Sequence, residues 1–197
     1  MTTINTQTNM AHPPWLKQTT ADLDRHEGFR EFAYPDPLSA LAKQYPARKY
    51  GWGRRPASVI AAELGLTQAD LDKGRPWTVG HGFTHRVTPD SSIKKEASMH
   101  RLREEALSHV ADLHRILPEW RAFPVYAQTV VANMAFNLGI DRLSKFNTTL
   151  DLLNKRDFAA AGTNLRKSLW FKQVGHRAEE LVERLEKGII QPQFKVI

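Results

Sequence analysis

Two acidic residues of the chain, Glu27 and Asp36, have the types and spacing that could do chemistry together. Glu27 is expected at a helix end beside Phe29 and Phe32, where partial burial would raise its pKa and suit it to general-acid catalysis. Asp36 stands between two prolines, where solvent and backbone amides keep a carboxylate ionised. Two carboxylates in unlike surroundings are what glycoside hydrolysis requires. Solvated surface acids are the alternative, because 21 acidic residues among 197 give about two such pairs by chance.

Metal and thiol chemistry are not expected. The chain has no cysteine, which excludes a thiol nucleophile, a disulfide scaffold and every Cys-based zinc site. His81 and His85 are four residues apart, a spacing that binds metal on one face of a helix. They fall instead in a Gly-rich strand and turn, with no third ligand nearby. We therefore expect no metal site and no cofactor.

The elements that must position these residues can be read from the hydrophobic pattern. Residues 1–13 are expected to form a loose leader, followed by a helix that begins at Pro14 and stops at Gly28. The stretches REFAYPDP and PWTVGHGFTH predict two short extended pieces. Between them, residues 37–76 hold two short helices, PASVIAAELG and TQADLDKG, the second with Thr67 as its N-cap.

The second half of the chain has the pattern of a helical protein. Residues 93–117 contain no Gly or Pro and repeat apolar residues at helical spacing, which predicts one long helix. A nearly all-apolar helix follows Pro124 and stops at Gly139, and three shorter helices are expected over 148–155, 157–168 and 176–187. The predicted fold is α+β and mainly helical, in a single domain. It divides into a small N-terminal lobe with a short sheet (15–92), a connecting helix (93–117) and a helical C-terminal lobe (118–190).

The charge of the chain bears on its partners. A net charge of +7 favours polyanions such as nucleic acid, anionic lipid headgroups or the acidic polymers of a bacterial envelope. Acids are interspersed among the basic residues, and no helix-turn-helix, zinc-finger or RNA-recognition signature is present. No apolar run approaches the ~20 residues that span a bilayer, and the N-terminus has no signal-peptide pattern. We therefore expect a soluble protein, made in the cytoplasm, that binds no specific nucleic acid.

Several motifs resemble one known family. The stretches RHEGFREFAYPD, WTVGHGFTH, NMAFNLG and NLRKSLWFKQVGHRAEEL resemble the phage-type lysozymes of glycoside hydrolase family 24, the endolysins of tailed phages. That family has Glu-Gly at the end of its first helix, Asp nine residues on, and Thr in a T-x-G-x-G strand. Glu27, Asp36 and Thr78 occupy these positions. The resemblance covers residues 15–36 and 77–188 and implies a lysozyme-like fold.

The resemblance also implies roles for individual residues. Glu27 corresponds to the catalytic acid, and Asp36 with Thr78 to the pair that holds the attacking water. Phe136, Thr149 and Asn164 fall on positions that line the saccharide-binding cleft. Trp170 and Arg177 match positions that we interpret as structural. The chain departs from the family in carrying Phe83 where many members have His, and in placing residues 37–77 where members have only a few residues.

The function that follows from the resemblance is that of an endolysin. It would hydrolyse the β-1,4 bond between N-acetylmuramic acid and N-acetylglucosamine of bacterial peptidoglycan, by single displacement with inversion. We expect a monomer that is released to the wall by a separate pore-former, with anionic outer-membrane or wall polymers as further partners. The alternatives are a lytic transglycosylase and a non-catalytic basic protein that binds cell wall or nucleic acid.

The segment 37–76 sets this chain apart. Its apolar residues are expected to dock the segment on the N-terminal lobe: Trp52, Val59, Ile60, Leu64, Leu66 and Leu71. Basic and aromatic residues form a front that would border the cleft: Lys43, Tyr45, Arg48, Lys49, Tyr50, Trp52, Arg54 and Arg55. This front either grips glycan or acidic stem peptide, or is the solvated edge of a passive elaboration.

Overall fold

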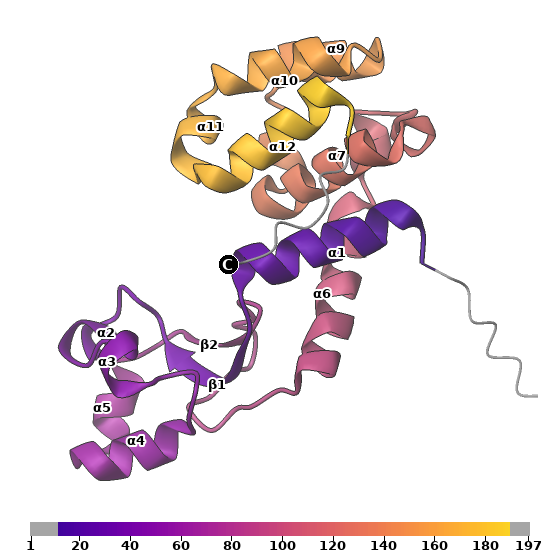
Figure 1. Ribbon diagram of the computed structural model, residues 1–197. Helices are drawn as coiled ribbons and strands as arrows, with labels where there is room; N and C mark the ends of the chain where they lie inside the picture. The colour runs from indigo at the N-terminus through magenta and orange to yellow at the C-terminus, as the bar shows by residue number, and fades with distance from the viewer. Residues whose placement is uncertain (1–11, 190–197) are drawn as a thin grey trace, which may run out of the picture. The chain divides into compact units, whose positions relative to one another are not determined.

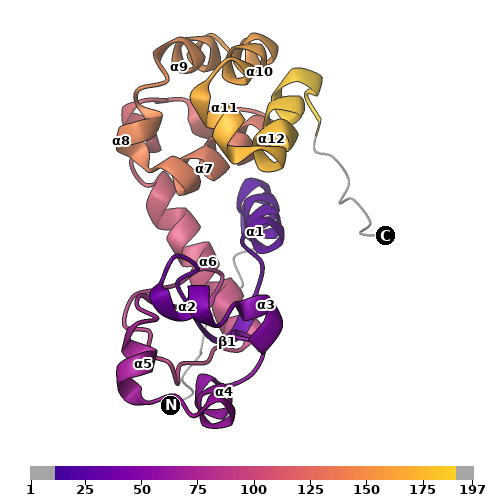
Figure 2. The ribbon, with the colours of Figure 1, turned by 90° about the vertical axis from the view of Figure 1, so that its left-hand side faces the viewer.

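The computed structural model describes residues 12–189, so most of the expected leader and residue 190 lie outside the described residues. The chain forms two compact units (Figures 1 and 2). Unit 1 comprises the described parts of Met1–Thr19 and Ala106–Ile197, and unit 2 is Thr20–Glu105. The predicted class, a mainly helical α+β fold with a small sheet, is confirmed. No helix in the described part of the chain combines the length and apolarity needed to cross a membrane.

Unit 2 is built on a two-stranded antiparallel sheet. Helix α1 (Pro14–Glu27) ends where Gly28 takes a φ of +66°, a conformation that glycine adopts without strain. Strand β1 (Arg30–Pro35) follows and pairs with β2 (Trp77–Gly80), with Tyr34 opposite Thr78 and Pro35 opposite Trp77. The helix end and both extended pieces were thus predicted correctly from the sequence.

The segment between the two strands is folded, as predicted, and supplies half of the core of unit 2. It contains α2 (Ala40–Gln44), α3 (Ala47–Tyr50), α4 (Ala57–Leu64) and α5 (Gln68–Asp72). The indoles of Trp52 and Trp77 meet edge to face at 5.6 Å, in a cluster with Leu41, Ile60 and Leu71. This cluster joins the inserted segment to the sheet.

Two details of this segment correct the sequence-based expectation. Val59 is 44% exposed and does not dock, because α4 turns Ile60 and Ala61 toward the core instead. Trp52 is only 1% exposed and its Nε1–H donates to the carbonyl of Tyr45 at 2.9 Å, so it belongs to the core and not to the basic front.

Unit 1 is a helical assembly around α7 (Val125–Leu138). The helices that follow it are α8 (Ile140–Leu143), α9 (Asn147–Asn154), α10 (Phe158–Arg166), α11 (Leu169–Val174) and α12 (His176–Lys187). Helix α12 packs against α7 and α10, and Figure 1 shows α10 and α12 side by side. Its buried stripe is the one the sequence predicted as core packing: Ala178, Leu181, Val182 and Leu185. Helices α8 and α11 were not predicted.

The expected long helix over 93–117 is wrong in its extent. Helix α6 runs from Lys95 to Val110, and a turn then leads to the short 3-10 helices η1 (Leu113–Arg115) and η2 (Trp120–Ala122). Leu113 and Leu117 are fully buried nonetheless. Asp112 is a weak helix former, and Pro118 disfavours helical backbone at Leu117, the residue before it. Tertiary burial of the two leucines therefore bends the chain here.

Candidate active site

Glu27 is the last residue of α1, directly before the sheet. Its position follows from Gly28, which ends the helix and lets the chain enter β1 at Arg30. The side chain of Glu27 is exposed, so the expected partial burial against Phe29 and Phe32 is not found. Both phenylalanines are half-buried, and Phe29 faces the His81 ring at 5.5 Å.

The pairing of the two strands brings Asp36 to the end of the sheet where β2, the strand of Thr78, begins. The register sets Tyr34 opposite Thr78, and the amide of Asp36 donates to the carbonyl of Pro76 at 3.1 Å. Tyr34 and Thr78 lie opposite one another and therefore share a face of the sheet, and Asp36 is the first residue after β1, beside the start of β2. The intervening residues 37–77 therefore return the chain to Asp36 before β2 begins.

Local hydrogen bonds fix the carboxylate of Asp36. Its Oδ1 accepts from the amide of Leu38 at 2.6 Å, and its backbone carbonyl accepts from the amide of Ser39 at 2.9 Å. These contacts form the turn between β1 and α2, as expected for an acid between two prolines. Thr78 is 8% exposed at the centre of β2. Its backbone is held by the ladder, which positions its hydroxyl.

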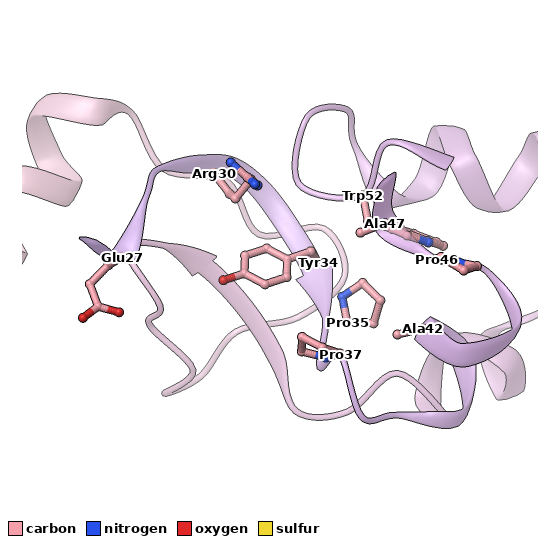
Figure 3. A pocket seen from close by; sticks show the side chains of 9 residues that line it. All are labelled: Glu27, Arg30, Tyr34, Pro35, Pro37, Ala42, Pro46, Ala47 and Trp52. Carbon is pink, nitrogen blue, oxygen red and sulfur yellow. The ribbon is translucent and has the colours of Figure 1, made fainter. Parts of the chain in front are cut away.

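Glu27 also lines a pocket of about 350 Å³ that lies wholly within unit 2 (Figure 3). One part of the lining is polar, with Glu27, Arg30 and the hydroxyl of Tyr34, which points from β1 toward Glu27. The rest is apolar and comes from β1 and the inserted segment: Pro35, Pro37, Ala42, Pro46, Ala47 and Trp52. The sequence analysis did not single out Arg30 and Tyr34, although both stand in the stretch RHEGFREFAYPD.

The electrostatics of Tyr34 reflect this setting. Burial raises the pKa of its hydroxyl, and the charge of Glu27 adds to this effect while that of Arg30 opposes it. Tyr34 is therefore a neutral hydrogen-bond donor on the same sheet face as Thr78.

A buried histidine ties the strand of Thr78 to two helices. His81 is 3% exposed, and its Nε2 lies 2.7 Å from Oδ1 of Asp24 on α1. Because a carboxylate only accepts, Nε2 carries the proton, and Nδ1 can accept from the hydroxyl of Ser98 on α6 at 2.7 Å. Lys95 completes the cluster with its Nζ 3.2 Å from Oδ2 of Asp24. Asp24 is one helical turn before Glu27 on α1. The cluster therefore links the end of β2, the strand of Thr78, to the end of α1 that carries Glu27.

The order Ser98, His81, Asp24 matches the residue types of a nucleophilic triad, but the surroundings do not. Ser98 is fully buried at 0% exposure, so no substrate carbonyl can reach its hydroxyl. A Cβ on Gly80 would lie 2.6 Å from that hydroxyl, so the absence of a side chain at Gly80 lets the serine approach the strand. The cluster is a structural clamp.

The structure also gives the surroundings of Phe83 and of the two histidines that flank it in the sequence. Phe83, where many family members have His, is 3% exposed and lies 4.0 Å beneath the guanidinium of Arg101. His85 is exposed, and both ring nitrogens of His81 are engaged in protein hydrogen bonds. Among residues 12–189 no three His, Asp or Glu side chains are grouped so that they could hold a metal ion.

The three other predicted site residues belong to unit 1. Thr149 on α9 is 1% exposed, and its hydroxyl accepts from Nδ2 of Asn164 on α10 at 2.9 Å. Phe136 on α7 is half-buried, with its ring 5.1 Å from that of His109. The structure thus brings Thr149 and Asn164 together, and Phe136 lies on a different helix of the same unit.

Trp170 and Arg177 have structural contacts. Trp170 is 5% exposed, and its Nε1–H donates to Oδ1 of Asn137 at 3.0 Å. Arg177, in the first turn of α12, donates from Nε to Oδ1 of Asn133 on α7 at 2.9 Å. Both side chains bind α7 to the helices that follow it.

Comparison with known proteins places these observations in a family. The sequence profile of the family described as phage lysozyme matches residues 61–187, which is well over half of the chain. The chain belongs to the phage lysozyme family. Thr78, Phe136, Thr149 and Asn164 lie within the matched residues of this phage lysozyme family member, whereas Glu27 and Asp36 precede them.

Two individual proteins are similar to parts of the chain. The chain is 34% identical over 77 residues to the pre-baseplate central spike protein Gp5 of Enterobacteria phage T4, covering 39% of this chain and 13% of that protein. It is 23% identical over 101 residues to the probable T4-type lysozyme 2 of Dictyostelium discoideum, covering 51% of this chain and 59% of that protein. The chain therefore spans less than two thirds of the length of either relative.

Proposed function

We propose that this protein is an endolysin that hydrolyses the β-1,4 bond between N-acetylmuramic acid and N-acetylglucosamine in bacterial peptidoglycan. The observation that supports the proposal is the pairing of β1 with β2 directly after the helix that ends in Glu27, in which Tyr34 lies opposite Thr78 and the amide of Asp36 bonds to the carbonyl of Pro76. Membership of the phage lysozyme family supports peptidoglycan as the substrate.

In the proposed mechanism Glu27 donates a proton to the glycosidic oxygen as the bond breaks. Its carboxyl group is exposed in the free protein, so a bound saccharide must remove the water around it. Loss of that water disfavours the charged form of a carboxyl group and so favours the proton-donating form. Substrate binding would thus prepare the acid, in place of the expected burial against aromatic residues.

Asp36 and Thr78 act on the opposite face of the sugar in this proposal. The amide of Leu38 anchors Oδ1 of Asp36, and no side chain among the described residues bonds its Oδ2. Oδ2 can accept a proton from a water molecule that the Thr78 hydroxyl also holds. A water held this way attacks the anomeric carbon directly, so the product has inverted configuration.

The fate of the enzyme in the cell belongs to the same proposal. A peptidoglycan hydrolase made in the host cytoplasm acts only after a separate pore-former gives it access to the wall, and its action there lyses the cell. We propose that the protein acts as a monomer, with anionic wall or outer-membrane polymers as additional partners.

The identity of the reaction products tests this proposal. Purified peptidoglycan digested with the protein should release fragments that end in reducing N-acetylmuramic acid, and the first-formed anomer should be inverted. Fragments that end in an anhydro sugar, lighter by one water, would identify a lytic transglycosylase. Binding to the wall with no soluble fragments would identify a non-catalytic protein, and a retained anomer would refute single displacement alone.

A further inference from the structure

We infer that the pocket beside Glu27 is a saccharide subsite whose outer wall is built by the inserted residues 37–52, and that it takes one N-acetylated hexosamine ring of the glycan strand. The inference rests on the proposed function, because it concerns the same substrate. It adds a binding site that the catalytic residues do not require.

The first argument is that the wall is fixed before any ligand binds. The amide of Phe32 on β1 donates to the carbonyl of Gly53 at 3.2 Å. The aliphatic stem of Arg30 packs over the same glycine, where a Cβ would lie 2.9 Å from Cδ of the arginine. The Trp52 indole is held at one end by Tyr45 and at the other by Trp77. A preformed wall loses little conformational entropy on binding.

The second argument is the chemistry of the lining. Prolines, alanines and the ring of Tyr34 form an apolar surface backed by the buried Trp52, and the charged groups and the Tyr34 hydroxyl lie on the side of Glu27 (Figure 3). A hexosamine ring has apolar C–H faces and an acetyl methyl group to set against such a surface. Its hydroxyls and amide can meet Arg30, Tyr34 and Glu27. The volume of about 350 Å³ is at the lower end for small-ligand pockets, which fits one ring.

The third argument is the charge of the lining, which does not suit the peptide stem of the wall, the main alternative to a sugar ring. A stem peptide carries several carboxylates and would call for several cations. Arg30 is the one cation that lines the pocket, and Glu27 balances its charge. The basic residues of the insertion, such as Lys43 and Arg48, do not line it.

Filling the pocket tests the inference. Ala47 lines the pocket on the exposed surface of α3, so Ala47→Leu should occupy part of it without disturbing the core. The matched control is Ala69→Leu, an exposed alanine on α5 of the same insertion that does not line the pocket. Thermal melting of both variants should equal that of the wild type. KM and kcat are then measured on intact peptidoglycan and on peptide-free glycan strands prepared with an amidase.

We expect Ala47→Leu to raise KM about tenfold on both substrates, as a steric mismatch in a ligand pocket does, with kcat little changed and the control unaffected. A KM raised only on peptide-bearing walls would show that the pocket takes the peptide and overturn the inference. An unchanged KM on both substrates would overturn it as well.

A binding measurement separates this inference from the proposed function. The Glu27→Gln variant is titrated with the tetramer of N-acetylglucosamine while the amide NMR signals of Ala42, Ala47 and Trp52 are followed. Shifts at these residues that Ala47→Leu abolishes would support the subsite even if the wild type failed to digest peptidoglycan. Absence of shifts there would refute the subsite even if the wild type digested it.

Discussion

At the scale of single residues, the contact that most shapes the candidate site is one between parts of the chain far apart in sequence. His81 reaches Asp24 across 57 residues and Ser98 across 17, and so joins β2 to α1 and α6. Sequence reasoning weighed His81 only as a metal ligand, because its neighbours in the fold are not neighbours in the chain. Glu27, Asp36 and Thr78, in contrast, are proposed as site residues from motifs that are local in sequence.

Removing the imidazole of His81 should destabilise unit 2. We expect His81→Ala to lower the free energy of unfolding by about 3 kcal/mol, because two buried hydrogen bonds and the packing against Phe29 are lost. Exposed His85 is the matched control, and His85→Ala should change stability by less than about 0.5 kcal/mol. Urea unfolding measures both, and equal stability of the two variants would refute the clamp.

The same cluster predicts a dependence of stability on pH. Burial raises the pKa of Asp24, but hydrogen bonds from His81 and Lys95 outweigh it and hold the pKa below its usual value. A lowered folded-state pKa gives stability that is present above the ordinary Asp pKa of about 3.9 and is lost as pH falls through the lower value. Wild type should therefore exceed Asp24→Asn in stability at pH 6, and the difference should shrink below about pH 4.

Urea titrations of the two proteins between pH 6 and pH 2 check this expectation. A difference that stays constant over the whole range would mean that the charge of Asp24 contributes nothing.

At the scale of elements, patterns with strong local signals were predicted well and short elements were not. Helix α12 begins and ends where the sequence indicated, and the capping box of Thr67 with Asp70 starts α5 as expected. Helices α2 and α3 were missed because each has five residues or fewer, too short for an apolar periodicity. Leu41 of α2 is buried in the cluster around Trp52, and Tyr50 of α3 packs partly buried against the same cluster, a tertiary effect that no local pattern displays.

The basic front of the insertion is smaller than predicted. Trp52 is buried, and Arg55 is held by Glu63 through two hydrogen bonds of 2.9 and 2.7 Å. Arg55 stays exposed in spite of this ion pair, as do Arg48, Lys49 and Arg54. These exposed side chains decide whether the front binds wall polymer or is a passive, solvated edge.

Replacing Arg48, Lys49 and Arg54 together by Ser should raise KM on cell walls severalfold with kcat unchanged, if the front grips anionic wall polymer. The matched control removes the same charge from exposed lysines of unit 1, by replacing Lys145, Lys155 and Lys172 with Ser. Kinetics on purified walls and thermal melting measure both variants. Equal KM for the triple variant and the wild type would assign the front a passive role.

At the scale of the whole molecule, the net charge of +7 should govern encounters with anionic walls. Activity on whole walls should fall as salt rises well above about 0.15 M, where the Debye length drops below about 8 Å. Activity on a short neutral oligosaccharide should hardly change, because it offers no charge to attract. Initial rates on both substrates across a salt series test this, and equal salt sensitivity would point to loss of stability in place of screened attraction.

The central claim is that Glu27 is the acid of a peptidoglycan hydrolase, and the rate of digestion of purified peptidoglycan by Glu27→Gln tests it most directly. Glu31→Gln is the matched control, since it removes the same charge four residues away, where Glu31 pairs with Lys94 at 2.8 Å. We predict that Glu27→Gln melts like the wild type but loses about 10²–10⁴-fold in rate, whereas Glu31→Gln stays active. A folded Glu27→Gln variant that digests peptidoglycan at more than about a tenth of the wild-type rate would contradict the claim.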